Sequence, residues 1–364
     1  MIAQAHAYKP DYAIPPGEIL EETLEACGLS KSEFARRCGR PTKTVSEIIA
    51  GKSAITPETA IQFERVLGVP APFWTNLESK YQLRLAEAAE QKDLAKCGAW
   101  ASCFPVKEMV SFGLIPKPSD TTDTVQKLLD FFGVASVQAW QRRFDPNAVA
   151  YRRSKAFESA PEAVACWLQW GEVIARDIVC EPFDGQEFRR ALQEIRELTR
   201  EERVDAWRPR LLELCRSAGV AVAFAPELPK TRLSGAARWL TKDKALIQLS
   251  LRHKTDDHLW FTFFHEAGHI LLHGKKDVFI DDETGQKDEK EKEANRFAAN
   301  ALIPPAVWRA FAARPRFSKV SVSRFAEQQG IAAGIVVGRL QHEELLPYAH
   351  LNGLKRRFEW TVRA

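Results

Sequence analysis

The chain has 364 residues, 45% of them hydrophobic and 27% charged, which is the composition of a globular protein with two or three domains. Its net charge of +4 is too small for a chain-wide surface that binds polyanions, so any contact with nucleic acid must be local. No run of about 18 apolar residues and no basic-then-apolar leader occurs, which predicts a cytoplasmic protein without membrane contact.

The stretch from Leu29 to Lys52, LSKSEFARRCGRPTKTVSEIIAGK, has the layout of a helix-turn-helix. Ser30 can cap a first helix over residues 31–38, and Gly39 opens the turn. A second helix is predicted over residues 42–50, and a third begins at Thr56 and Pro57. The predicted shared core consists of Phe34, Ala35, Val45, Ile48 and Ile49.

The same stretch carries six basic residues against two acidic ones, a local surplus that suits contact with DNA phosphates. The start of the second helix is where such modules read base edges. The predicted DNA contacts are Arg40, Thr42, Lys43, Thr44, Ser46 and Lys52. Glu47, on the second helix, favours the competing interpretation, a protein-interaction module that kept the fold.

The segment from Pro16 to Tyr81 resembles the HigA antitoxin group of the Xre-type DNA-binding fold. The similarity includes PGEILEE, the helix-turn-helix itself and ITPETAIQFERVLGVPAPFW. It implies binding of a double-stranded DNA operator through the second helix. It also implies a homodimer, because proteins of this kind bind palindromes as dimers.

Between Lys92 and Cys215 the pattern is helical, rich in tryptophan and punctuated by prolines. Aromatic residues at helical spacing, as in VASVQAWQRRF and ACWLQWGE, favour a scaffold with an aromatic core. A sensor for a small molecule or a nucleic acid is the alternative for this region.

Three short apolar segments follow, GVAVAFA (219–225), SGAARWL (234–240) and KALIQLSL (244–251). Proline, glycine or TKDK bounds each of them, which predicts three strands with tight connections. Two helices come next. The first contains WFTFFHEAGHILLHG, and the second contains ANRFAANALI and ends at Pro304.

His265 and His269 are four residues apart in the first of these helices, so they project from one face. They can bind one metal ion together, with Glu266 beside them as a general base. On an otherwise apolar helix unpaired imidazoles are costly, and metal ligation removes that cost. The alternative is a core helix whose histidines are satisfied by hydrogen bonds.

A catalytic metal needs a third protein ligand and an open position for water. The candidates are Glu289, Glu291 and Glu293, which precede the second helix. We choose Glu293, which is next to the apolar face of that helix, with Glu289 as the fallback. His273, one turn beyond His269, either competes for the ion or lies behind the ligands.

Two histidines, a carboxylate and a neighbouring glutamate predict zinc-dependent peptide hydrolysis. Zn2+ would acidify water and polarise a carbonyl, while Glu266 passes the proton to the leaving amine. The same ligands accept Mn2+ or Fe2+. A non-haem iron oxygenase also uses two histidines and a carboxylate, but it has no need of Glu266.

The segment LIQLSLRHKTDDHLWFTFFHEAGHILLHGKK followed by EKEANRFAANALIP resembles the ImmA/IrrE family of bacterial metallopeptidases. The resemblance implies that His265, His269 and Glu293 bind zinc and that Glu266 is the general base. It also implies cleavage of one specific protein partner, such as a repressor or antitoxin. In such folds the strand before the metal helix pairs with an extended substrate. KALIQLSL would be that edge here, with a plain core strand as the alternative.

The tail SVSRFAEQQGIAAGIVVGRLQHEELL again has helix–glycine–helix spacing but few basic residues, which favours packing or a clamp near the active site.

The predicted fold class is α+β. An all-α helix-turn-helix domain and a helical middle region precede a zincin-like domain with a small β-sheet and the HExxH helix. The predicted segments are residues 1–90, 91–215, 216–312 and 313–364.

These features predict a bacterial DNA-binding transcriptional regulator fused to a zinc-dependent endopeptidase. The alternative is an antitoxin-like regulator whose peptidase-like domain holds a structural or sensory metal without proteolysis. Self-cleavage in a linker over residues 85–97 is a third interpretation.

The seven cysteines are odd in number and scattered, so we expect them to be reduced and mostly buried.

Overall fold

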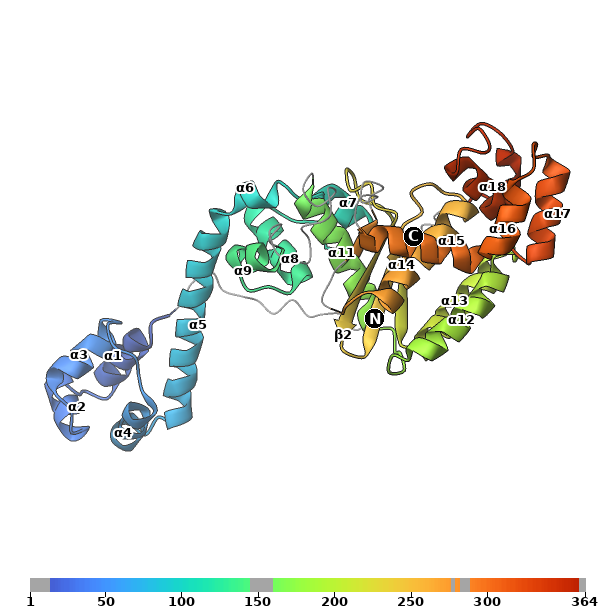
Figure 1. Ribbon diagram of the computed structural model, residues 1–364. Helices are drawn as coiled ribbons and strands as arrows, with labels where there is room; N and C mark the ends of the chain where they lie inside the picture. The colour runs from blue at the N-terminus through green and yellow to red at the C-terminus, as the bar shows by residue number, and fades with distance from the viewer. Residues whose placement is uncertain (1–13, 145–159, 276–278, 282–288, 360–364) are drawn as a thin grey trace. The chain divides into compact units, whose positions relative to one another are not determined.

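The computed structural model describes residues 14–144, 160–275, 279–281 and 289–359. The chain divides into two compact units, Met1–Cys97 and Gly98–Ala364, and most of their helices are labelled in Figure 1. The helices of the first unit are α1 (Pro16–Ala26), α2 (Lys31–Arg37), α3 (Thr42–Ile49), α4 (Pro57–Leu67) and α5 (Ala71–Ala95).

The second unit combines helices with one sheet. Its helices before the sheet are α6 (Gly98–Ala101), α7 (Val106–Ser111), α8 (Thr121–Phe132), α9 (Val137–Arg143), α11 (Pro161–Arg176), α12 (Gly185–Leu198) and α13 (Val204–Ser217). Its strands are β1 (Val220–Phe224), β2 (Gly235–Thr241), β3 (Lys244–Leu249) and β4 (Phe279–Asp281). Its remaining helices are α14 (Asp256–Leu272), α15 (Glu289–Leu302), α16 (Pro305–Ala312), α17 (Lys319–Gln329), α18 (Ala333–His342) and the short 3-10 helix η1 (Asn352–Leu354).

Local signals shape the first unit. The Ser30 hydroxyl accepts a hydrogen bond from the Glu33 backbone N–H at 3.2 Å, and Thr56 caps α4 in the same way. Gly39 has a φ of 65°, so α2 turns into α3 through a left-handed residue. Helices α2 and α3 confirm the predicted helix-turn-helix. Its core contains Leu20, Leu24, Phe34, Ala35, Val45, Ile48, Phe63 and Trp74, with Ile49 packed beside them.

The sheet has the strand order β1-β3-β2-β4. Strand β1 pairs with β3 in parallel, whereas β2 is antiparallel to both β3 and β4. The three predicted strands are confirmed, and β4 is an addition. Because β3 is hydrogen-bonded on both sides, the prediction that KALIQLSL forms the sheet edge is wrong, and its alternative, a core strand, holds. The outer strand next to β2 is β4.

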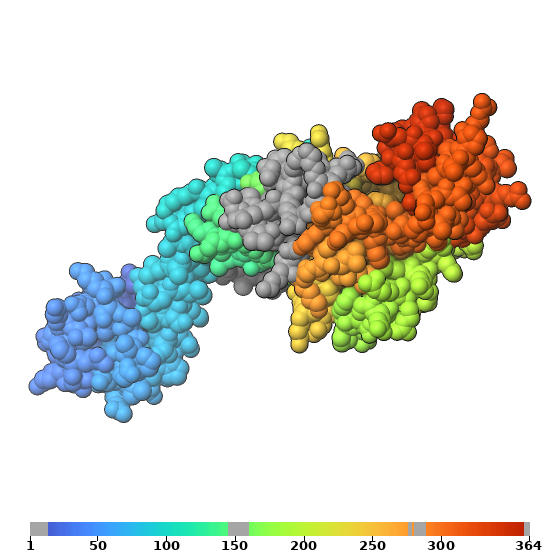
Figure 2. All heavy atoms as spheres, in the orientation of Figure 1, coloured from blue at the N-terminus to red at the C-terminus, as the bar shows by residue number. Residues whose placement is uncertain are grey.

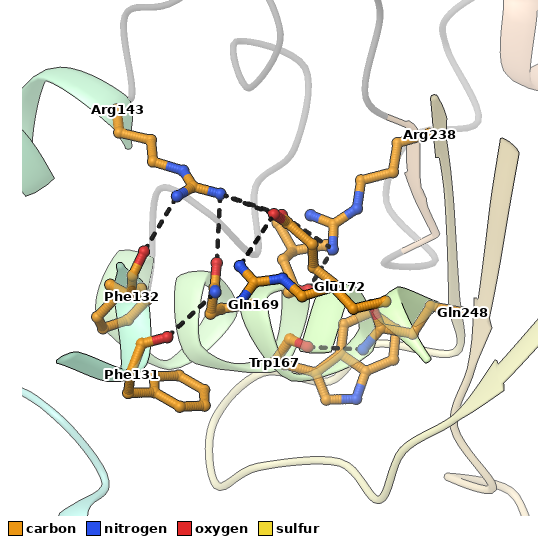
Figure 3. A network of polar contacts seen from close by, with 10 residues as sticks. Phe131, Phe132, Arg143, Trp167, Gln169, Glu172, Arg238 and Gln248 are labelled. Atoms are coloured by element: carbon orange, nitrogen blue, oxygen red, sulfur yellow. Dashed lines mark hydrogen bonds and ion pairs between the residues drawn. The ribbon is translucent and has the colours of Figure 1, made fainter. Parts of the chain in front are cut away.

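Helix α11 joins the tryptophan-rich region to the sheet. The Gln248 side-chain amide on β3 donates to the Trp167 carbonyl at 2.6 Å, and the Arg238 guanidinium on β2 donates to the Leu168 carbonyl (Figure 3). On the other side, Arg143 at the end of α9 pairs with Glu172 at 3.1 Å. The middle region therefore packs on the sheet and belongs to the second unit.

Helix α14 is the centre of the second unit. It packs against β2 and β3 on one side and against α15 and α18 on others. Trp260, Phe263 and Phe264 on α14 are buried in a core shared with the sheet and the C-terminal helices. In the space-filling view α15 to α18 form a continuous surface, orange to red (Figure 2).

The C-terminal segment holds the first turn of α14. A Cβ at Gly338 on α18 would lie 2.6 Å from an Asp257 carboxylate oxygen, so the two helices approach closely there. The Lys355 ammonium pairs with Asp257 at 2.7 Å, and the Arg356 guanidinium pairs with the buried Asp256 at 3.3 Å. The tail therefore packs against the helix that carries the HExxH motif.

Three smaller expectations have different outcomes. None of the seven cysteines forms a disulfide, but only three are buried, so the prediction that most are buried is wrong. Residues 85–95 belong to α5, so the proposed self-cleavage segment is mainly helix rather than open linker. Among the described residues, no helix combines the length and the apolar character needed to span a membrane.

Candidate metal centre and helix-turn-helix surface

The candidate metal centre lies where α14 crosses α15. Small residues allow the two helices to approach, because a Cβ at Gly268 would lie 3.3 Å from the Cα of Ala294 and 3.1 Å from the Phe297 ring. Ala294 and Ala298 on α15 are fully buried. The close crossing brings acidic side chains near the start of α15 within reach of the histidines of α14.

Three side chains place donor atoms together. The Nε2 atoms of His265 and His269 lie 2.9 Å apart. One carboxylate oxygen of Glu291 is 3.1 Å from His265 Nε2, and the other is 3.4 Å from His269 Nε2. These are the three residues, among those described, whose ligand atoms all lie within 4.8 Å of one another.

Glu291, rather than the predicted Glu293, lies with the two histidines. Glu291 lies three residues before Ala294 and four before Asn295, so it shares the face of α15 that contacts α14. Its side chain is 16% exposed, whereas that of Glu293 is 47% exposed. Glu293 is two residues further along, more than half a helical turn around α15, where its carboxylate meets His273 Nε2 at 3.1 Å. The fallback, Glu289, is exposed and pairs with Lys292.

Hydrogen bonds behind the histidines fix their tautomers. The Asn295 side-chain oxygen lies 2.9 Å from His265 Nδ1, and since an amide oxygen only accepts, Nδ1 carries the proton and Nε2 is bare. Glu293 likewise accepts from His273 Nε2. The bare Nδ1 of His273 then accepts from His269 Nδ1 at 3.0 Å, which leaves His269 Nε2 bare as well.

The charge states agree with these tautomers. Burial lowers the pKa of His269 to about 4, so its imidazole is neutral near pH 7. Neutral imidazole and ionised carboxylate are the forms that bind metal.

The donor set fits a divalent cation. With their Nδ1 atoms protonated, the two Nε2 atoms and the Glu291 oxygens face one another as electron-pair donors without a hydrogen between them. Such an arrangement is repulsive unless a cation lies among the donors. Two imidazole nitrogens and one carboxylate are the protein ligands of a catalytic zinc site, which keeps its fourth position for water or substrate.

Glu266 lies beside this centre and faces the sheet. Its side chain is fully buried, on the residue that follows His265. A Cβ at Gly235, the first residue of β2, would lie 2.6 Å from Glu266 Oε1 and also from Thr262. A glycine at the start of β2 therefore leaves room for the carboxylate next to the ligands.

Strand β4 covers the ligands from the other side. The Phe279 ring stacks on the His269 imidazole, with centroids 4.0 Å apart and an interplanar angle of 15°. It also contacts His273 at 5.1 Å. The outer strand of the sheet thus passes directly beside the candidate ligands.

The helix-turn-helix presents its polar residues to solvent. Thr42, Lys43 and Ser46 on α3 and Lys52 after it are exposed, while Thr44 and Arg40 are half-buried. Arg40 donates to the side chain of Gln62 on α4. The opposite side of α3 is anchored by the buried Val45 and Ile48. The six predicted DNA-contact residues therefore lie on or next to one short helix.

Comparison with known proteins supports both regions. The family described as IrrE N-terminal-like domain, a peptidase family, matches residues 215–341, and the helix-turn-helix family matches residues 20–74. An uncharacterized HTH-type transcriptional regulator of Escherichia coli, YddM, is 37% identical over 81 residues, which are 22% of this chain and 84% of the relative. The chain belongs to the HTH-type transcriptional regulators. Its helix-turn-helix domain is fused to an IrrE N-terminal-like domain.

Two solved structures with similar sequences align with the helix-turn-helix part of this chain. The Pseudomonas aeruginosa antitoxin HigA, solved with the higBA promoter, is 36% identical with a TM-score of 0.22, and the alignment covers 22% of this chain and 90% of that one. A Pseudomonas aeruginosa protein in complex with its operator DNA is 37% identical with a TM-score of 0.21, over 21% of this chain and 85% of that one.

Within the IrrE-like domain, the sequence interpretation missed Asn295 and the role of the start of β2. Asn295 had a signal, because it lies four residues after Glu291 on one helical face, and this spacing could have indicated that Glu291 faces the histidines. Gly235 and Phe279 carried none, since the contacts that matter come from strands distant along the chain.

Proposed function

We propose that this fusion protein is a DNA-binding regulator whose IrrE-like domain is a metal-dependent endopeptidase that cleaves a specific protein. The observation that carries the proposal is the convergence of His265, His269 and Glu291, with the buried Glu266 beside them. This donor set leaves one side for water and substrate, and a site that holds metal only structurally has no use for a buried general base.

In this proposal each side chain has a defined task. A divalent ion such as Zn2+, bound by the three ligands, would supply Lewis acidity toward water and a peptide carbonyl. Glu266 accepts a proton from the attacking water and delivers it to the leaving amine. Asn295 and the Glu293–His273 pair keep the ligand nitrogens bare. Glu293 thereby becomes a positioning residue.

The structural-metal alternative requires a fourth protein ligand. The candidate for that position is His273, one helical turn beyond His269. Its Nε2 contacts Glu293 and its Nδ1 contacts His269 Nδ1, so both ring nitrogens are engaged behind the ligands. This arrangement favours a site that is open to substrate.

The regulator half supports binding of double-stranded DNA, as the description of YddM as a transcriptional regulator suggests. Lys43, Thr42 and Ser46 lie exposed at the start of α3, the part of a helix-turn-helix that enters the major groove. Dimerisation on a palindromic operator belongs to the same proposal. The cleaved partner would then be a repressor or antitoxin whose removal changes transcription.

The test compares protein termini in cells that express the wild-type chain, Glu266→Gln or the surface control Glu289→Gln. Loss of a general base should slow cleavage by about 100-fold or more. We therefore expect new termini in one or a few proteins with the wild-type chain and Glu289→Gln, and none with Glu266→Gln. Identical termini with Glu266→Gln would contradict the proposed mechanism. Intact mass of the purified chain distinguishes cleavage of a partner from self-cleavage.

A further inference from the structure

A cavity of about 370 Å3 opens next to the metal centre, between α14, α15 and α18. Its walls are mostly apolar, with Phe261 from α14, Ala299 and Leu302 from α15, and Ile335 from α18. Its size falls in the range of pockets that hold ligands, about 300–1,000 Å3. Neither the metal ligands nor Glu266 line this cavity, so the proposed chemistry leaves its role open.

The cavity lies beside His265, although that residue does not line it. Asn295 lines it and, through its side-chain oxygen, contacts His265 Nδ1 at 2.9 Å. Phe261 is one helical turn before His265, and the two rings are 6.4 Å apart. A peptide bond held at the metal centre would therefore have a neighbouring side chain within reach of the cavity.

The charges around the cavity favour one kind of occupant. Lys355 pairs with Asp257 at 2.7 Å, and Arg339 pairs with Glu343 at 2.9 Å. Arg296 lines the cavity on the exposed side of α15 and has no ion-pair partner among the described residues. The cavity therefore has an apolar wall and, at Arg296, one guanidinium without an ion-pair partner among the described residues, which can bind a carboxylate.

From this geometry we infer that the cavity is the specificity pocket of the peptidase and receives a large apolar side chain next to the cleaved bond. A nearby acidic residue of the substrate pairs with Arg296. The inference rests on the proposed function and names its substrate class, which is a segment with a large apolar residue beside an aspartate or glutamate. Ala299 and Ile335 then set the size of the accepted side chain.

Two variants change the pocket in opposite directions. Ala299→Phe fills it, while Ile335→Ala enlarges it. Asn300→Phe adds the same ring at an exposed position of α15 and is the matched control. Arg296→Glu reverses the unpaired charge. Differences of one or a few methylenes in such a pocket change kcat/KM by about 10- to 200-fold.

The experiment uses the zinc-loaded full chain and a peptide mixture from a pepsin-digested bacterial lysate. Cleavage sites are mapped with chains that keep Glu266, the wild type and each pocket variant. Bound peptides are mapped with the same chains carrying Glu266→Gln, which should bind without cutting. We expect large apolar residues beside the cut and among the bound peptides. Ala299→Phe should reduce both by about tenfold or more, Ile335→Ala should shift them toward tryptophan, and Arg296→Glu should abolish the acidic preference. Asn300→Phe should change neither.

The two hypotheses fail differently. Cleavage without an apolar preference, or a preference that Ala299→Phe and Ile335→Ala leave unchanged, would overturn the pocket assignment and leave the peptidase intact. Apolar peptides that bind to Glu266→Gln and are lost with Ala299→Phe, without cleavage by the wild-type chain, would support the pocket and contradict the peptidase. A mixture from which nothing is bound or cut would contradict the pocket as well.

Discussion

The two units place their polar groups in opposite ways. In the first, Lys43 and Ser46 project into solvent from a short helix whose other side is anchored in a small apolar core. In the second, His265, His269 and Glu266 are buried, and each depends on contacts from other elements. An exposed surface tolerates single replacements, because water satisfies what remains, whereas a buried polar centre does not. The following variants test this contrast.

Gly17→Val should have the largest effect. A Cβ at Gly17 on α1 would lie 2.6 Å from the Cα of Ile49 and overlap two carbonyl oxygens of α3, and backbone cannot move aside as a side chain can. We expect the first unit to lose its fold and its DNA binding. Calorimetry of the full chain should show one transition lost and that of the second unit unchanged.

Glu22→Val, at an exposed position of the same helix, is the control and should melt like the wild-type chain apart from a small loss of helix propensity. A first unit with Gly17→Val that melts at the wild-type temperature would disprove the close contact between α1 and α3. If both transitions moved together, the two units would not be independent.

Asp256 should give the second unit a distinctive dependence on pH. Burial raises the pKa of this carboxyl from 3.8 to about 6, against the attraction of Arg356. The favourable contribution is complete below about pH 4, where both states are protonated, and is lost as the pH rises through 6, because the folded state must then ionise a buried group. The difference between a pKa of 3.8 and one of about 6 corresponds to roughly 3 kcal/mol.

The measurement is the free energy of unfolding of wild type and Asp256→Asn between pH 4 and 7.5. Asparagine cannot ionise, so the wild-type chain should lose stability relative to the variant across this range. Asp243→Asn, in the exposed turn between β2 and β3, controls for removal of a surface charge. A difference that does not vary with pH would contradict the burial argument.

Lys43→Ala should have the smallest effect on the protein and a specific one on DNA. Lys43 is exposed and only distantly paired with Glu47, at 3.8 Å. Loss of one phosphate contact should weaken binding to a mixed-sequence duplex several-fold and lower the slope of log affinity against log salt by about one. Lys80→Ala on α5 is the control. Equal slopes for wild type and Lys43→Ala would exclude Lys43 from the DNA surface.

What could be predicted from the sequence depended on whether the deciding contacts are local or come from elements distant along the chain. Ser30, Gly39 and Thr56 signal helix ends through contacts within a few residues, so the helix-turn-helix could be predicted in detail. The HExxH pair was equally local, because both histidines share one helix. The third ligand was not. Glu291 and Glu293 differ by two positions, and the contact of Ala294 and Phe297 with Gly268 decides which carboxylate faces the histidines.

The most direct test of the metal centre is zinc affinity by chelator competition for wild type, Glu291→Gln and Glu293→Gln. We expect stoichiometric zinc with the wild type and loss of stable binding with Glu291→Gln. Glu293→Gln should still bind one zinc per chain, about 10- to 100-fold more weakly, because the Glu293 carboxylate acts on the ligands only through His273. Full binding by Glu291→Gln together with loss of zinc from Glu293→Gln would contradict the ligand set and restore Glu293 as the third ligand.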